Sequence, residues 1–172
     1  MRVVILGNSG SGKSTLARWF ASHTGAASLD LDTVAWEPGK VAVPRAPEVA
    51  VAMVRAFCEA HTQWVVEGCY AGLVSATFPF APRLLFLNPG VDRCIAHCRA
   101  RPWEPHKYAS AQEQDARLDM LLAWVAAYDT REGDLSLKGH RACFEGYAGP
   151  RHELTEPLSL DPPSRELLEW AR

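Results

Sequence analysis

The chain has 172 residues, of which 48% are apolar and 22% charged, and its formal net charge is −2. This length and balance fit one globular domain spanning 1–172, and they exclude a fibrous repeat and a disordered chain. The slightly acidic balance excludes a broad cationic surface and so counts against direct nucleic-acid binding.

The predicted elements alternate between short apolar strands and helices. Continuous apolar runs predict strands at 2–6, 27–31, 64–66 and 84–87, and a fifth strand is expected at 151–154. Helical patterns predict one helix after Ser14 and others at 47–61, 91–100, 112–130, 135–147 and 163–171. The alternation predicts a three-layer α/β fold with a central parallel sheet. The proline-containing segment 102–110 is predicted to be a mobile connection.

One motif lies between the first predicted strand and the first predicted helix. It fits the pattern G-x-x-x-x-G-K-[ST], in which glycines turn backbone N–H groups inward at a helix N-terminus. The pattern predicts that Lys13 reaches the β- and γ-phosphates of a nucleotide and that the Ser14 hydroxyl binds Mg²⁺. The predicted ATP-binding loop consists of Gly7, Asn8, Ser9, Gly10, Ser11, Gly12, Lys13, Ser14 and Thr15.

The motif alone leaves several classes of nucleotide-binding protein open. The guanine-reading N-K-x-D and the switch D-x-x-G of GTPases are absent in suitable register, and the chain is short for a mechanical ATPase. The small size favours a compact kinase, because phosphoryl transfer needs positioning and charge neutralisation more than covalent chemistry.

The order of several stretches resembles the P-loop small-molecule and nucleoside-monophosphate kinases, which include adenylate, shikimate and gluconate kinases. The stretches are "GNSGSGKST", "LDLDTVAW", "WVVEGCY", "LLFLNP" with "CIAHCRAR", and "LLAWVAAYDTR". The chain is most similar to bacterial adenylate-kinase-like proteins labelled DNA topology modulation proteins. The resemblance implies a P-loop fold with five parallel strands in the order 2-3-1-4-5 and a short helical lid near 99–131.

The resemblance also implies roles for acidic residues. In the D-x-D stretch, it implies that Asp30 supports the Mg²⁺ shell and that Asp32 meets the acceptor hydroxyl as a base or orienting group. Glu67 would lie beside the phosphate loop and a Mg²⁺-bound water. The alternative for both aspartates is a helix-capping or turn role. Trp36 and Tyr70 are candidates for lining the acceptor pocket, with a core or rim position as the alternative.

The lid arginines of these kinases stabilise the charge of the transferring phosphoryl group. The resemblance assigns this role to Arg101, with Arg99 as its neighbour, and to Arg131; the alternative is a solvated arginine at a helix end. The arginine motifs by which adenylate kinases clamp a substrate phosphate are missing, and the only arginines between 30 and 80 are Arg45 and Arg55. The acceptor therefore stays open.

The cysteines and histidines show no metal-binding pattern. Five cysteines without a framework spacing predict reduced thiols and a cytoplasmic location. Cys94 and Cys98 lie four residues apart, but no second pair completes a zinc site. Neither a signal-peptide pattern nor a membrane span is present, so we expect no membrane partner. We expect a surface or helix-capping position for His23, His61, His140 and His152.

These patterns together predict an ATP- and Mg²⁺-dependent phosphotransferase acting on a small hydroxyl- or phosphate-bearing acceptor. Two alternatives stay open: a non-catalytic or regulatory ATP-binding module, including a DNA-related role, and an ATPase that switches a protein partner. The predicted catalytic residues are Lys13, Asp32, Arg101 and Arg131. The predicted metal site consists of Ser14, Asp30 and Glu67.

Overall fold

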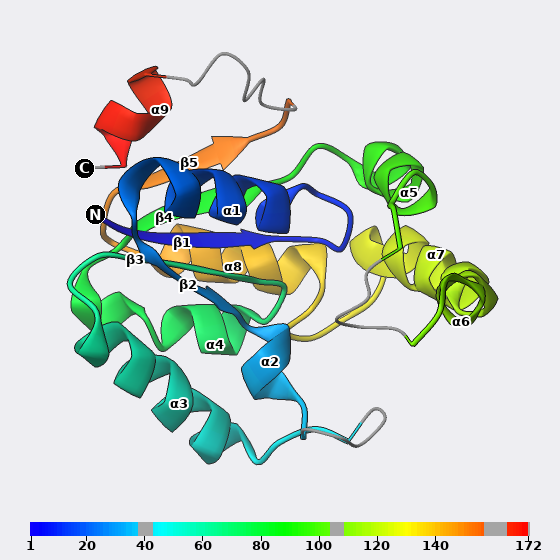
Figure 1. The fold of residues 1–172 in the computed structure, drawn as a ribbon, viewed down its shortest axis with the longest axis horizontal. Helices are drawn as coiled ribbons and strands as arrows, with labels where there is room; N and C mark the ends of the chain where they lie inside the picture. The colour runs from blue at the N-terminus through cyan, green and yellow to red at the C-terminus, as the bar shows by residue number, and fades with distance from the viewer. Residues whose placement is uncertain (38–42, 104–108, 157–164, 172) are drawn as a thin grey trace.

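The computed structural model describes residues 1–37, 43–103, 109–156 and 165–171. Its centre is a five-stranded sheet in the order β2-β3-β1-β4-β5, in which every neighbouring pair is parallel (Figure 1). The predicted fold class and strand order are therefore confirmed. The strands are β1 (Arg2–Gly7), β2 (Ala27–Asp30), β3 (Trp64–Gly68), β4 (Arg83–Leu87) and β5 (Arg151–Leu154).

Helices cover both faces of the sheet and complete three layers (Figure 1). One face packs against α1 (Lys13–Thr24) and α9 (Arg165–Trp170). The other face packs against α3 (Pro47–Ala60), α4 (Ala71–Ser75) and α8 (Leu137–Gly146). None of the described helices combines the length and the apolar character needed to cross a bilayer.

The central strand β1 shows how the sequence produces these layers. Val3 and Ile5 belong to the core beneath α1, whereas Val4 and Leu6 belong to the core beneath α3 and α4. All four side chains are fully buried. Because successive side chains of a strand point to opposite faces, a continuous apolar run is what a strand covered on both faces requires.

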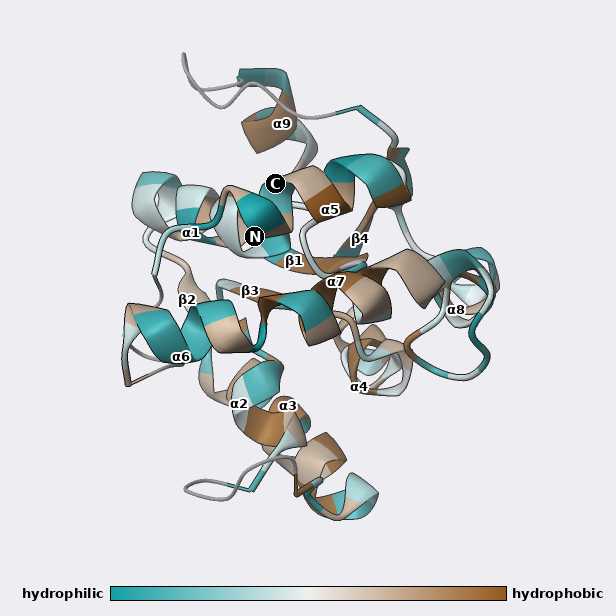
Figure 2. Ribbon diagram, turned by 90° about the vertical axis from the view of Figure 1, so that its right-hand side faces the viewer, coloured by the Kyte–Doolittle hydropathy of each residue, from teal (hydrophilic) through white to brown (hydrophobic). Residues whose placement is uncertain are grey.

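Three helices lie beyond the carboxyl ends of the strands, at the right of Figure 1. They are α5 (Val91–Arg99), α6 (Ala111–Ala116) and α7 (Leu118–Ala126). Figure 2 is seen from this end and shows brown, hydrophobic stretches of the central strands β1 and β3 behind these helices. A small core of Cys94, Cys98 and Val125 joins α5 to α7. Most of the predicted connection 102–110, with His106 and Tyr108, lies outside the described residues.

The predicted single helix over 112–130 is wrong. The chain forms α6, α7 and a 3₁₀ turn, η2 (Ala127–Asp129), with a break at Arg117. The Arg117 N–H bonds to the carbonyl oxygen of Gln114 at 3.1 Å, a three-residue step that tightens the backbone and ends α6. No proline or glycine occurs in this segment, so the apolar pattern continues through the break.

Candidate active site

The predicted phosphate loop joins β1 to α1, as its motif requires. β1 ends at Gly7 and α1 begins at Lys13. Gly10 has a φ of +78°, and a Cβ atom there would collide with the carbonyl oxygen of Cys94 in α5. A Cβ atom on Gly7 would lie 2.5 Å from the carbonyl oxygen of Leu87 at the end of β4. Both positions require glycine because the loop packs directly against neighbouring backbone.

The loop keeps several polar groups inside the fold. Lys13 is 8% exposed, and its Nζ donates to the carbonyl oxygen of Asn8 at 2.8 Å. The Asn8 amide in turn donates to the carbonyl oxygen of Val125 at 3.2 Å. The buried Ser11 hydroxyl has no hydrogen-bond partner among the described residues. An orphaned hydroxyl beside an ammonium group and a helix N-terminus fits an anionic ligand such as a polyphosphate.

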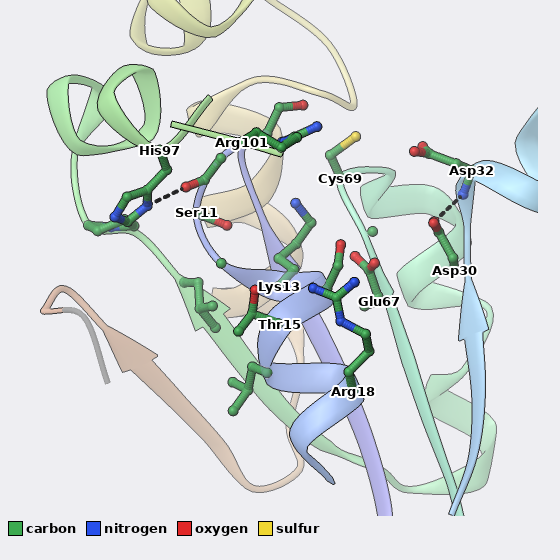
Figure 3. Close-up of a pocket in the computed structure, with 18 of the residues that line it drawn as sticks. Ser11, Lys13, Thr15, Arg18, Asp30, Asp32, Glu67, Cys69, His97 and Arg101 are labelled. Carbon is green, nitrogen blue, oxygen red and sulfur yellow. Dashed lines mark hydrogen bonds between the residues drawn. The ribbon is translucent and has the colours of Figure 1, made fainter. Parts of the chain in front are cut away.

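Three carboxylates face the loop from the ends of β2 and β3: Asp30, Asp32 and Glu67, here called the carboxylate wall (Figure 3). The parallel register pairs Asp30 with Glu67. One oxygen of Asp30 accepts from the N–H of Asp32 at 2.9 Å, where α2 (Asp32–Ala35) begins. Asp30 therefore shapes the turn after β2, as the turn alternative predicts, and it also lines the pocket.

A chain of two hydrogen bonds orients Asp32. Trp36 Nε1 donates to the Tyr70 hydroxyl at 2.7 Å, and this hydroxyl donates to Asp32 Oδ1 at 2.7 Å. Since an indole N–H can only donate, the phenolic proton has to point toward Asp32. Burial raises the pKa of Tyr70, and Asp32 raises it further, so the phenol remains a donor. Neither aromatic residue lines the pocket itself, which favours the rim alternative.

Glu67 is the most deeply buried of the three carboxylates, with 4% exposure. Burial raises its pKa, and the charges of Asp30 and Asp32 raise it further. Lys13 and a hydrogen bond from the Ser14 hydroxyl act in the opposite direction. A divalent cation bound here would stabilise the charged form of Glu67.

The donor set suits Mg²⁺ in a nucleotide site. Across the described residues, no group of three or more His, Cys, Asp or Glu side chains forms a metal cluster. Mg²⁺ at such sites binds through one or two carboxylates and the substrate phosphates, and it keeps several waters. The hydrogen-bonded pair of Ser14 and Glu67 fits this pattern.

A pocket of about 690 Å³ brings most of the predicted residues together (Figure 3). Gly7 and Asn8 do not line this pocket but support the loop from beneath. Arg131 does not line the pocket either. The predicted residues in the pocket wall are Ser9, Gly10, Ser11, Gly12, Lys13, Ser14, Thr15, Asp30, Asp32, Glu67 and Arg101.

The end of α5 contributes basic groups above the loop. Figure 3 shows Arg101 between His97 and Cys69, over Lys13. His97 Nδ1 lies 2.8 Å from the carbonyl oxygen of Gly10. A carbonyl can only accept, so Nδ1 is assigned the hydrogen, and His97 braces the loop. Arg99 is exposed and does not line the pocket.

Arg131 has its guanidinium engaged outside the pocket wall. Its Nε donates to the carbonyl oxygen of Leu135 at 2.8 Å, and its Nη2 lies 3.3 Å from Asn8 Oδ1. The guanidinium also stacks on the Trp124 ring at 3.9 Å. Arg131 therefore ties the chain after α7 to the phosphate loop, and its catalytic role stays a prediction.

The predicted surface or capping position is wrong for His140, which is fully buried. Its Nε2 lies 2.7 Å from the carbonyl oxygen of Cys69, and its Nδ1 lies 2.6 Å from the Tyr128 hydroxyl. Because the carbonyl can only accept, Nε2 is assigned the hydrogen and Nδ1 accepts from Tyr128. Burial lowers the pKa of His140 to about 4, so the ring is neutral at pH 7. His140 thus supports the backbone at the pocket edge.

Two further residues, Arg18 and Cys69, line the pocket but belong to no sequence motif. Arg18 lies one helical turn after Ser14 in α1, and Figure 3 shows its guanidinium beside Glu67. The i, i+4 spacing from Ser14 is the signal that could have identified it. Cys69 follows β3, and burial raises the pKa of its thiol to about 11, so the group is neutral at pH 7.

No protein-family model and no curated protein matches the chain. A sugar kinase from Janibacter sp. HTCC2649 is 18% identical with a TM-score of 0.52, over 98% of this chain and 92% of its own. A gluconokinase from Sinorhizobium meliloti 1021 is 18% identical with a TM-score of 0.51, over 99% of this chain and 90% of its own. A shikimate kinase from Bacteroides thetaiotaomicron is 20% identical with a TM-score of 0.54, over 98% of this chain and 97% of its own. The chain therefore has the P-loop fold of these kinases.

Proposed function

We propose that the chain is an ATP-dependent phosphotransferase that moves the γ-phosphate of ATP to a small hydroxyl-bearing acceptor. The observation that carries the proposal is the single pocket in which the phosphate loop faces the carboxylate wall. A module that only binds nucleotide needs the loop alone. The wall adds a group placed to orient the acceptor and take its proton. The fold shared with a sugar kinase, a gluconokinase and a shikimate kinase supports the proposal.

In the proposed reaction, the acceptor hydroxyl oxygen forms a bond to the γ-phosphorus of ATP. The bond between that phosphorus and the β–γ bridging oxygen breaks, and ADP leaves with the electron pair. The hydroxyl proton passes to the carboxylate of Asp32, which Tyr70 orients. Lys13 and Arg101 stabilise the negative charge of the transferring group, and their contribution is largest in the transition state.

Ser14 and Glu67 would hold Mg²⁺, with Asp30 beside them in the neighbouring strand. When bound, the ion neutralises charge on the β- and γ-phosphates. The chain's own contribution is to keep these oxygen donors next to the loop. Ser14 lies in the first turn of α1, and Glu67 is fixed in the buried strand β3.

Transfer from ATP labelled on its γ-phosphate tests the proposal directly. The acceptors are a panel of sugars, sugar acids, amino sugars, nucleosides and nucleotides, each supplied with Mg²⁺. We expect label in at least one acceptor product with the wild-type protein and none with Lys13→Ala. Lys138→Ala is a matched control, because Lys138 is exposed and pairs with Glu132 at 3.0 Å on the surface. Tight ATP binding without transfer to any acceptor would contradict the proposal.

The same experiment separates the alternatives. Steady release of inorganic phosphate without an acceptor would instead support an ATPase that switches a protein partner. Duplex DNA binding that persists at near-physiological salt would support the DNA-related role, because non-specific phosphate contacts weaken steeply as salt rises. The three neighbouring structures are kinases of small molecules and give the DNA-related role no support.

A further inference from the structure

The side chain of Asn8 joins the phosphate loop to distant parts of the chain, although it does not line the pocket. Asn8 is 1% exposed. Its Oδ1 accepts from the backbone N–H of Ser9 at 2.9 Å and from Nη2 of Arg131 at 3.3 Å. Its Nδ2 donates to the carbonyl oxygen of Val125 at 3.2 Å. One amide group therefore connects the loop to the end of α7 and to the segment that follows it.

These three partners require an amide at position 8. Backbone N–H and guanidinium groups only donate, and a carbonyl oxygen only accepts, so the amide oxygen has to face Ser9 and Arg131. A carboxylate of the same shape has no hydrogen for Val125, and an alanine leaves all three partners without the amide. The pattern G-x-x-x-x-G-K-[ST] allows any residue at this position, so phosphate binding by the motif does not explain the asparagine.

The backbone of the same residue holds Lys13. The Lys13 ammonium donates to the carbonyl oxygen of Asn8 at 2.8 Å, and the Ser11 N–H donates to this oxygen at 3.2 Å. An ammonium group has three hydrogens, so Lys13 can keep this bond while it donates to the phosphates of a nucleotide. A rotation of the Asn8 backbone would move the oxygen that anchors Lys13. The three hydrogen bonds of the Asn8 amide oppose such a rotation.

Arg131, one of the three partners, is itself fixed. Its guanidinium donates to the carbonyl oxygens of Trp124 and Leu135 and stacks on the Trp124 ring at 3.9 Å. Arg131 and the end of α7 therefore form a frame that does not depend on the loop. Because Arg131 meets the loop at Asn8, it can influence Lys13 without touching a phosphate.

We propose, resting on the proposed kinase function, that Asn8 is a positioning residue for phosphoryl transfer. Its amide fixes the loop backbone against α7 and Arg131, and its carbonyl oxygen thereby places the Lys13 ammonium at the phosphates. Asn8 itself touches neither ATP nor the acceptor. Its contribution therefore depends on Lys13, and removal of the amide costs little nucleotide affinity once the lysine is absent.

Binding of a nonhydrolysable ATP analogue with Mg²⁺, measured by calorimetry, tests this dependence without requiring transfer. We expect Asn8→Ala to weaken binding at least tenfold in the wild-type background and less than twofold in the Lys13→Ala background. Partial unfolding would lower the binding stoichiometry rather than the affinity of the folded molecules. Thr77→Val is the matched control, because Thr77 is fully buried, lies outside the pocket wall and donates to the Val74 carbonyl oxygen at 2.7 Å. This control should bind the analogue within twofold of the wild type.

Two results would overturn the inference: unchanged analogue binding in Asn8→Ala, or an equal loss in both backgrounds. If Asn8→Ala does not fold, Asn8→Ser replaces it in both backgrounds. A serine keeps a hydroxyl that can accept from the Ser9 N–H, but it is too short to join Val125 and Arg131 as well. The same comparison between the two backgrounds then decides.

Steady-state transfer gives a second readout that a purely structural role would not change. In Asn8→Ala, kcat at saturating ATP should fall at least tenfold, whereas the KM for the acceptor should stay within twofold, because the acceptor lies at the carboxylate wall. A raised KM for the acceptor with unchanged kcat would overturn the inference and leave the kinase intact. Absence of transfer by the wild type would overturn the kinase proposal, and analogue binding would still decide whether Asn8 positions Lys13.

Discussion

The two sides of the pocket are built by different means. The phosphate loop is made by one contiguous stretch whose glycines and helix N-terminus present backbone groups to an anion. The carboxylate wall is made by side chains from the end of β2, the start of α2 and the end of β3. One local hydrogen bond within the turn after β2 and one long-range hydrogen bond from Tyr70 orient it. The phosphate loop is suited to a polyphosphate, a ligand common to many proteins, whereas we propose that the carboxylate wall selects the acceptor. Five substitutions test this division, in order of decreasing expected effect.

Lys13→Ala removes the ammonium group of the phosphate loop. We expect turnover to fall by about 1,000-fold, because a preorganised cation in a desolvated site stabilises the developing phosphoryl charge strongly. The fold should persist, since the Lys13 ammonium makes one described hydrogen bond, to the Asn8 carbonyl oxygen. Steady-state transfer and the thermal unfolding midpoint are the measurements, with Lys138→Ala as the control. Unchanged turnover would show that the loop is not the donor site.

His140→Gln tests the buried histidine that supports the Cys69 backbone at the edge of the pocket. His140 has a folded-state pKa of about 4 against an ordinary value of 6.5. Between these values the unfolded state binds more protons than the folded state, so the free energy of unfolding falls as the pH falls. The full loss is about 3 kcal/mol, of which about 2 kcal/mol is expected by pH 5.

Urea unfolding of the wild type and of His140→Gln between pH 7.5 and pH 5 measures this loss, which the variant should lack. Burial raises the pKa of both Glu67 and Asp134, and these groups act in the opposite direction. Both proteins contain them, so their effect cancels in the comparison. An equal pH dependence in both proteins would contradict a neutral, buried His140.

Arg101→Ala removes the cation that lies above the phosphate loop. We expect turnover to fall by about 100-fold while the ATP dissociation constant changes little, because the guanidinium contributes most when charge moves to the transferring group. Single-turnover transfer and calorimetric ATP binding separate the two quantities. Arg99→Ala is the matched control, since Arg99 is exposed and outside the pocket wall. Equal losses in turnover and affinity would make Arg101 a ground-state ligand.

Arg131→Ala should lower the stability of the fold more than it lowers turnover. Its guanidinium bonds to the carbonyl oxygens of Trp124 and Leu135, and charged hydrogen bonds of this kind contribute about 2 kcal/mol. We expect the free energy of unfolding to fall by about this amount. Chemical denaturation measures it, and turnover is then corrected for the folded fraction. A large loss of turnover with unchanged stability would establish the transition-state role that the resemblance implies.

Tyr70→Phe has the smallest expected effect. It removes the hydroxyl that orients Asp32 but keeps the ring in place. We expect kcat to fall by about tenfold, or about 1.4 kcal/mol, with the KM for ATP unchanged, because only the acceptor-facing carboxylate loses its orientation. Trp36→Phe, which replaces the indole and its N–H by a smaller ring, should have a weaker effect in the same direction. A rise in the KM for ATP would place Tyr70 on the donor side instead.

The loop could be predicted because its determinants are local. A glycine pattern, a lysine and a hydroxyl between a strand and a helix lie within residues 7–15. The sheet could be predicted because continuous apolar runs mark strands buried on both faces. The ends of β2 and β3 also follow, since the carboxyl ends of neighbouring parallel strands meet at one edge, which places Asp30 next to Glu67.

The remaining features depend on contacts between distant residues. His140 is buried against the carbonyl oxygen of Cys69, 71 residues earlier, and nothing near His140 in the sequence marks it as a core residue. The bond from Tyr70 to Asp32 spans 38 residues and requires the two strand ends to be placed first. The break at Arg117 arises where backbone hydrogen bonding changes, without a proline or glycine to signal it.

The close approach of Gly10 to α5 has a mechanical consequence. A side chain at Gly10 would collide with the Cys94 carbonyl oxygen, and His97 fastens the Gly10 carbonyl to the same helix. The loop and α5 are therefore in rigid contact, and a shift of one has to displace the other or break this hydrogen bond. A bound polyphosphate that moved the loop would therefore act on α5 through this contact and through the hydrogen bond between His97 and Gly10.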